Sequence, residues 1–168
     1  MIALFLRNCP EVTRFIPMPT YPELINQLGA QLGIEELTPD EDGLCLLELA
    51  GELFVEIDHD PGTNFLSLSS EVGRIPDALA PAWYPNLLEA NAFWIGTGGA
   101  TLGLHQATGS VILAYREPLR GLTAEYLSGL FDDFVTTAQI WKGRILEEPN
   151  QQGHPQTREK IPPGGLRV

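Results

Sequence analysis

The chain has 168 residues, of which 43% are hydrophobic and 19% are charged. This balance is typical of one folded domain and argues against a disordered chain. Ten basic residues against 22 acidic ones give a net charge of -12, which argues against nucleic-acid binding because that depends on basic groups at phosphates. The whole acidic excess lies in residues 1–146, since acids and bases balance from Glu147 onward.

The sequence has no feature of an exported or membrane-spanning protein. Cys9 and Cys45 are too few for a disulfide scaffold, and their flanks lack the spacing of a metal site. The apolar run at residues 1–6 is shorter than that of a signal peptide and lacks a basic start. No stretch approaches the roughly 18 apolar residues of a membrane helix. We therefore expect a protein of the reducing cytosol with no membrane partner.

The first predicted helix begins after an irregular N-terminal extension, residues 1–19, in which three prolines interrupt any periodicity. Thr20 and Glu23 form a capping-box pattern at the start of this helix. Gly33 is suited to end it, because glycine adopts the left-handed conformation of a helix C-cap. The apolar residues of this segment recur on one helical face: Leu24, Ile25, Leu28 and Leu32.

Three strands are predicted next, over residues 44–49, 53–58 and 64–70, and the short turns between them favour an antiparallel meander. In the middle strand an apolar set at positions 53, 55 and 57 alternates with Phe54, Glu56 and Asp58. This alternation predicts one buried face and one wetter face, which carries Phe54.

The second half of the chain predicts two more helices and a hairpin. A helix over residues 81–93 is followed by a glycine-rich link and by strands over 100–104 and 110–115. The helix over 123–146 has the clearest apolar periodicity, and residues 147–168 are predicted to be a disordered tail. The sequence therefore predicts an α+β domain over residues 20–146, with a five-stranded, mostly antiparallel sheet and three helices.

No set of residues has the spacing of a catalytic, metal or cofactor site. The glycine-rich run 96–103 lacks the phosphate-loop pattern and leads from a helix into a strand, the reverse of a nucleotide-binding turn. The acidic run at Asp40 is predicted to be a solvated turn. The segment 58–60 ends a strand beside Pro61 and Gly62, so a turn is favoured there over a metal site. His105 is expected to be a turn histidine and Cys45 a core residue.

Apolar surface is the remaining signal. Four large residues exceed what a monomer of this size would conveniently hide: Phe54, Trp83, Phe93 and Trp94. Contiguous exposed apolar surface usually marks a partner site, although each of these residues alone is more often part of a core.

An ordered set of short segments resembles the class I type III secretion chaperones, the Tir chaperone or CesT-like family. The resemblance lies in Leu87-Leu-Glu-Ala-Asn91, Gly99-Ala-Thr-Leu-Gly-Leu104 and Gly109-Ser-Val-Ile-Leu113. Residues 28–34 are similar to the family's first helix and its ending, 40–46 to its acidic turn, and 134–141 to its last helix. The N-terminal extension departs from the family pattern. Met18 is the only methionine after Met1, and we suggest it as the start of translation.

This resemblance implies a bacterial cytoplasmic homodimer, with the element order α-β-β-β-α-β-β-α, that binds the N-terminal region of a secreted effector. The effector would bind as an extended chain, be kept soluble and secretion-competent, and require no ATP. By analogy, the predicted effector contacts are Leu24, Leu28, Leu32, Phe54, Leu66 and Leu68. The predicted dimer contacts are Leu87, Leu88, Asn91, Phe93 and Leu102. The alternative is a regulatory or adaptor module on the same fold with a folded partner.

Overall fold

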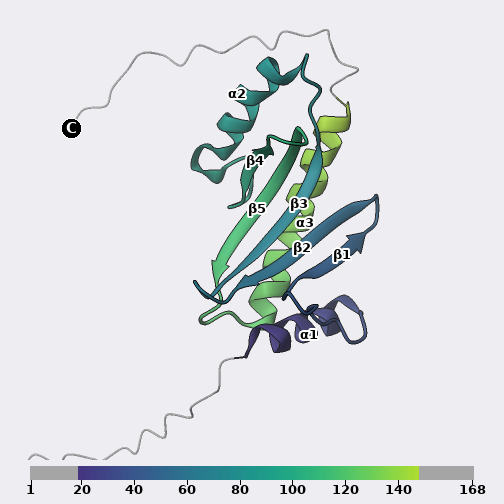
Figure 1. The fold of residues 1–168 in the computed structure, drawn as a ribbon, viewed down its shortest axis with the longest axis vertical. Helices are drawn as coiled ribbons and strands as arrows, with labels where there is room; N and C mark the ends of the chain where they lie inside the picture. The colour runs from purple at the N-terminus through teal and green to yellow at the C-terminus, as the bar shows by residue number, and fades with distance from the viewer. Residues whose placement is uncertain (1–18, 148–168) are drawn as a thin grey trace, which may run out of the picture.

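The computed structural model describes residues 19–147, so the expectations for residues 1–18 and 148–168 lie outside it. The elements follow the predicted order (Figure 1): α1 (Tyr21–Leu32), β1 (Cys45–Leu49), β2 (Leu53–Asp60), β3 (Phe65–Arg74), α2 (Ala80–Asn91), η1 (Ala92–Trp94), β4 (Thr101–His105), β5 (Ser110–Pro118) and α3 (Ala124–Glu147). The predicted α+β fold with a five-stranded sheet and three helices is confirmed, and η1 is an additional short 3-10 helix.

Both ends of α1 form as the sequence predicts. The capping box is present, with the Thr20 backbone N–H donating to the Glu23 carboxylate at 2.7 Å. This bond, with a second one from the Thr20 hydroxyl, lowers the pKa of Glu23. Gly33 ends the helix in the left-handed conformation at φ 74°.

The sheet is antiparallel throughout and has the strand order β1-β2-β3-β5-β4. The first three strands form the predicted meander, and β1 and β4 are the two edge strands. β3 runs four residues further than predicted, to Arg74, because it pairs with β5 along that length. A bulge between Glu71 and Gly73 interrupts this pairing.

The core lies on one face of the sheet only. α3 packs across β3 and β2 on that face and contacts α1, and it lies behind the sheet in Figure 1. The completely buried side chains include Val55, Ile57, Leu113 and Leu127. Within residues 19–147 no helix packs on the opposite face, and no helix there has the length and apolar character needed to cross a membrane.

α2 lies against β4 and ends at Asn91, two residues earlier than predicted. Trp83 and Leu87 of α2 are buried in the core, with 5% and 6% of their surface exposed. Trp83 therefore does not belong to the exposed apolar surface that was predicted from the sequence. Phe93 and Trp94 do, because η1 carries them away from the core.

Candidate protein-binding surfaces

Four of the six predicted effector contacts have no exposed surface in this structure. Leu24 and Leu28 form the buried stripe of α1, and Leu66 and Leu68 lie on the helix-covered face of β3. They were predicted by analogy with the family, but their spacing is that of a core, since side chains that share a face of an amphipathic element share its burial. A fully buried side chain cannot contact an effector in this conformation, so we withdraw these four. Leu32, partly buried, and Phe54 remain predictions.

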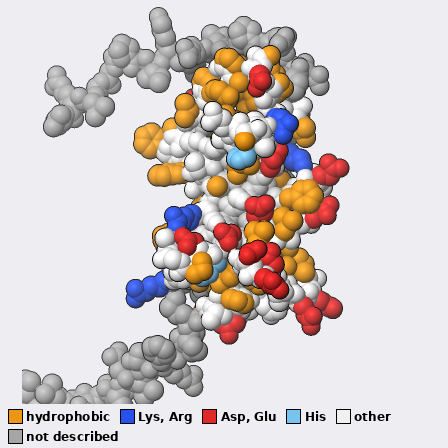
Figure 2. Space-filling view, viewed as in Figure 1, with side chains coloured by type: hydrophobic (Ala, Val, Ile, Leu, Met, Phe, Trp, Pro, Cys, Tyr) orange, Lys and Arg blue, Asp and Glu red, His pale blue; other side chains and the backbone are white. Residues whose placement is uncertain are grey.

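Phe54 belongs to the face of the sheet that no helix covers. We call this surface the open face. It is formed by the outward side chains of β1, β2, β3 and β5, among them Leu46, Glu48, Phe54, Glu56, Asp58, Ser69, Glu71 and Ile112. Leu46 is 56% exposed and Phe54 46%. Figure 2, which looks onto this face, shows hydrophobic side chains between acidic ones.

A hollow of about 440 Å³ lies on the open face where β2 and β3 separate. The ladder between the two strands is regular as far as Glu56 and Ser69, and beyond it the Ser70 hydroxyl donates to the Phe54 carbonyl at 2.7 Å. The Phe54 and Ile112 side chains line the hollow, and Glu71 stands beside them. The open face therefore offers a depression in which two apolar side chains lie among carboxylates.

The charge of the open face is strongly negative. Five exposed carboxylates lie on its strands: Glu48, Glu56, Asp58, Asp60 and Glu71. Among residues 19–147 the single ion pair is that of Arg116 with Asp60, at 3.8 Å. The Lys142 ammonium at the hollow already donates to the carbonyls of Gly51 and Glu52. A partner of this face gains most by being both apolar and basic.

The two edges of the sheet differ in their capacity to accept another strand. At β4 the Asn91 side chain accepts a hydrogen bond from the Leu102 N–H at 2.8 Å and donates to the Leu102 carbonyl at 2.9 Å. A strand edge is a template for pairing only while its backbone groups are free, so α2 blocks this part of β4. β1 pairs with β2 alone, and no backbone bond from Cys45–Leu49 to any other part of residues 19–147 occupies its outer edge.

Replacing Asn91 by alanine is expected to destabilise the fold by about 1–3 kcal/mol, because two partly buried backbone groups of Leu102 lose their partner. The measurement is the free energy of unfolding in urea. The matched control is Asn26→Ala on the exposed side of α1, for which we expect a change within about 0.5 kcal/mol. An equal effect of both substitutions would contradict the role of Asn91 at the edge.

The predicted dimer contacts divide between the core and the surface. Leu87 and Leu102 are buried, with 6% and 5% exposed, and Asn91 is engaged with β4. Leu88 and Phe93 are exposed, at 71% and 86%. Two neighbouring residues that were not among the predicted dimer contacts are exposed as well, Trp94 at 58% and Ile95 at 85%. We call Leu88, Phe93, Trp94 and Ile95 the aromatic patch.

The backbone of the aromatic patch is held in a costly conformation. Phe93 and Trp94 have φ angles of 55° and 56°, a region that costs a residue with a Cβ roughly 1–2 kcal/mol. The turn is fixed from both sides, because Gly96 donates to the Ala90 carbonyl at 3.1 Å and the Trp141 indole N–H donates to the Gly96 carbonyl at 2.9 Å. Strain and exposed aromatic surface at one place are typical of a functional contact.

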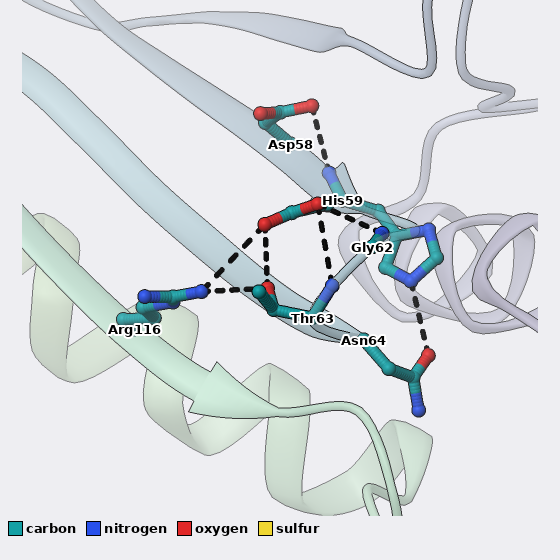
Figure 3. Close-up of polar contacts among 7 residues, drawn as sticks. Asp58, His59, Gly62, Thr63, Asn64 and Arg116 are labelled. Atoms are coloured by element: carbon teal, nitrogen blue, oxygen red, sulfur yellow. Dashed lines mark hydrogen bonds and ion pairs between the residues drawn. The ribbon is translucent and has the colours of Figure 1, made fainter.

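The acidic segment at the end of β2 builds a turn, as predicted. Asp60 accepts hydrogen bonds from the backbone N–H groups of Gly62 and Thr63. Figure 3 shows Gly62, Thr63 and Arg116 gathered at this turn. A further bond from the Thr63 hydroxyl and those backbone bonds lower the pKa of Asp60. His59 bonds Asn64 at 3.2 Å and stacks on Tyr21 with ring centroids 5.1 Å apart. These groups are satisfied by one another and by the turn.

The other positions considered for chemistry also have structural partners. The His105 ring bonds the Thr108 hydroxyl at 2.8 Å within the β4–β5 turn, which confirms it as a turn histidine. Asp40 accepts two backbone N–H bonds in the turn before β1. Cys45 is buried, and burial raises the pKa of its thiol. No group of three or more potential metal ligands occurs within residues 19–147.

Comparison with known proteins identifies what this arrangement is similar to. The sequence model of the Tir chaperone protein (CesT) family matches residues 23–142, whereas no curated protein sequence matches the chain. The ExsC–ExsE complex has 22% identity and a TM-score of 0.63, covering 73% of this chain and 90% of that one. The HopA1–SchA chaperone–effector complex has 18% identity and a TM-score of 0.62, covering 73% of this chain and 93% of that one. YbjN from E. coli, a proposed transcription regulator, has 16% identity and a TM-score of 0.56, covering 77% of this chain and 96% of that one.

Proposed function

This chain belongs to the Tir chaperone protein (CesT) family, and on that premise we propose that it is a type III secretion chaperone. It binds the N-terminal region of a secreted effector, keeps that effector soluble and competent for secretion, and uses no ATP. Its place of action is the bacterial cytoplasm. The family match supports the class of function, and the likeness to the ExsC–ExsE and HopA1–SchA complexes supports the shared fold.

The observation that carries this proposal is the open face beside the unoccupied edge of β1. An extended chain can add backbone hydrogen bonds at a free strand edge and place alternate side chains into pockets. Here the edge of β1 is free within the described residues, and Leu46 and Phe54 on the adjacent face provide apolar contact. An effector segment with alternating apolar side chains and basic neighbours fits this surface.

The aromatic patch supports the second part of the proposal, that the chaperone is a homodimer. In a two-fold symmetric dimer the same patch of both subunits meets itself, so a self-complementary apolar surface is suited to it. Leu88, Phe93 and Ile95 each expose more than two thirds of their surface. Leu87 and Leu102 are buried within the subunit, so we assign the proposed contact to the exposed residues of the patch.

The proposal includes no catalysis. Asp60 and His59 form hydrogen bonds in the turn between β2 and β3, and His105 forms one in the turn between β4 and β5. Binding of an extended client needs complementary surface only, and the open face and the β1 edge provide it without a reactive group.

The decisive test is co-expression with the product of the neighbouring open reading frame. The native chain should bring an otherwise insoluble effector into the soluble fraction through the effector's N-terminal region. Phe54→Asp places a charge in the apolar part of the open face. The affinity for the effector's N-terminal region should then fall at least about thirtyfold, as for the loss of an interface hot spot, and the yield of soluble effector should fall with it. Isothermal titration with the isolated N-terminal region measures the affinity.

The matched control is Ile140→Asp on the solvent side of α3, where Ile140 is 50% exposed and Phe54 46%. This variant should solubilise the effector as the native chain does. Equal losses in both variants, or rescue that depends on a folded domain of the effector, would contradict the proposal.

A regulatory or adaptor role on the same fold is the second candidate, and the structural likeness to YbjN is the observation that favours it. The two roles differ in the state of the partner. A chaperone binds an unfolded N-terminal segment, while an adaptor binds a folded protein and does not need the free edge of β1. Pull-down of a folded regulator that binds Phe54→Asp normally would favour the adaptor.

A further inference from the structure

We propose that the open face binds the chain's own N-terminal segment, residues 1–18, as an intramolecular occupant that an effector must displace. This goes beyond the proposed chaperone function, because it assigns a competitor to the surface and a role to residues outside the family match, which begins at residue 23. Its test uses no effector, so its failure and the failure of the proposed function are distinguishable.

The first argument is the chemistry that the open face lacks. Its apolar side chains, Leu46 and Phe54, are about half exposed, and the hollow of about 440 Å³ beside Phe54 is open to solvent. The surrounding carboxylates have no cationic partner among residues 19–147 apart from the Arg116–Asp60 pair. An occupant that is both apolar and basic would cover the exposed apolar side chains and neutralise the carboxylates.

The second argument is the composition of the N-terminal segment. Residues 1–18 carry two arginines, Arg7 and Arg14, against the single acid Glu11, whereas residues 19–147 carry five basic residues against 19 acidic ones. The segment is also rich in large apolar side chains: Ile2, Leu4, Phe5, Leu6, Val12, Phe15 and Ile16. Residues 148–168 have a similar charge excess but only three such side chains, Ile161, Leu166 and Val168. The N-terminal segment is therefore the better match for the open face.

The third argument is reach. Pro19, the first described residue, lines a hollow of about 580 Å³ together with His59 and Asn64, so the segment enters the fold at the end of the sheet where β2 turns into β3. From that end, β2 extends about 24 Å to Leu53 at ~3.4 Å per residue. The apolar run 2–6 precedes Pro19 by at least 13 residues, which span about 43 Å when extended. This length exceeds the distance along β2, so it is enough for the apolar run to reach Phe54.

Limited trypsin digestion of the full chain, followed by mass spectrometry, tests the proposal. Cleavage after Arg14 should be about tenfold slower than cleavage after Lys160, since proteolysis follows the population in which a segment is open. Phe54→Asp should raise the rate at Arg14 to that at Lys160. Phe5→Asp, which changes only the segment, should do the same, and it keeps the test valid if Phe54→Asp disturbs the fold. Ile140→Asp is the matched control and should leave Arg14 protected.

Each other outcome overturns the proposal. Equal cleavage at Arg14 and Lys160 in the native chain would show that the segment is not bound. Protection that survives both Phe54→Asp and Phe5→Asp would place it elsewhere on the molecule. Protection that is lost on dilution would assign the segment to the open face of a second copy. A native protein whose intact mass begins at Met18 would remove the segment altogether.

Discussion

Replacing Phe93 and Trp94 together by asparagine is expected to turn the proposed dimer into a monomer without lowering the stability of the folded subunit. The two side chains are 86% and 58% exposed, and they are the two aromatic members of the aromatic patch. Loss of an aromatic contact at the centre of an interface typically costs 2 kcal/mol or more. Each change occurs in both subunits of a symmetric dimer, so we expect self-association to weaken by at least about a thousandfold.

The stability of the subunit should not fall with the self-association, because both residues have φ angles near 55°. Asparagine is among the residues that tolerate this left-handed region best. The variant should therefore be as stable as the native subunit or more stable by up to about 1 kcal/mol, when both are compared as monomers. Sedimentation equilibrium measures the association, and urea unfolding at high dilution measures the stability.

Ile140→Asn on the exposed side of α3 is the control for this pair, since it removes a comparable exposed side chain outside the aromatic patch. It should leave the association unchanged. A double variant that still forms the native dimer would show that the contact lies elsewhere, and a native chain that is monomeric at all concentrations would contradict the homodimer.

The elements could be predicted from the sequence because each carries a local signal. Thr20, Glu23 and Gly33 mark the ends of α1 by their own hydrogen-bonding and backbone preferences. The alternation in β2 correctly separated Phe54 from the buried Val55 and Ile57. These signals depend on neighbours in the chain, so they can be read without knowledge of the fold.

The binding surfaces could be predicted only in part, because exposure depends on how the elements pack. Periodicity shows which side chains share a face, but it does not show whether a helix covers that face. Leu66 and Leu68 were predicted as effector contacts by analogy with the family, although α3 covers their face of the sheet. Ile95 was missed because a single apolar residue in a link has no periodicity, and its exposure depends on the left-handed turn at Phe93 and Trp94.

Leu24→Ala is expected to destabilise the subunit by about 2–5 kcal/mol, because Leu24 is completely buried between α1 and the rest of the core. The folded fraction should still bind the effector's N-terminal region with native affinity. Leu46→Ala removes the same number of atoms from a side chain that is 56% exposed on the open face. It should cost under about 1 kcal/mol of stability and weaken effector binding about tenfold.

The same substitution should thus lower mainly the stability at Leu24 and mainly the effector affinity at Leu46, which distinguishes a core residue from a binding residue. Urea unfolding gives the stability of each variant, and titration with the effector segment at a temperature where both are folded gives the affinity. If Leu24→Ala lost the effector while keeping its stability, α1 would have to move on binding and expose the stripe that the core now holds. The withdrawn contacts at Leu24 and Leu28 would then return as effector contacts in a rearranged subunit.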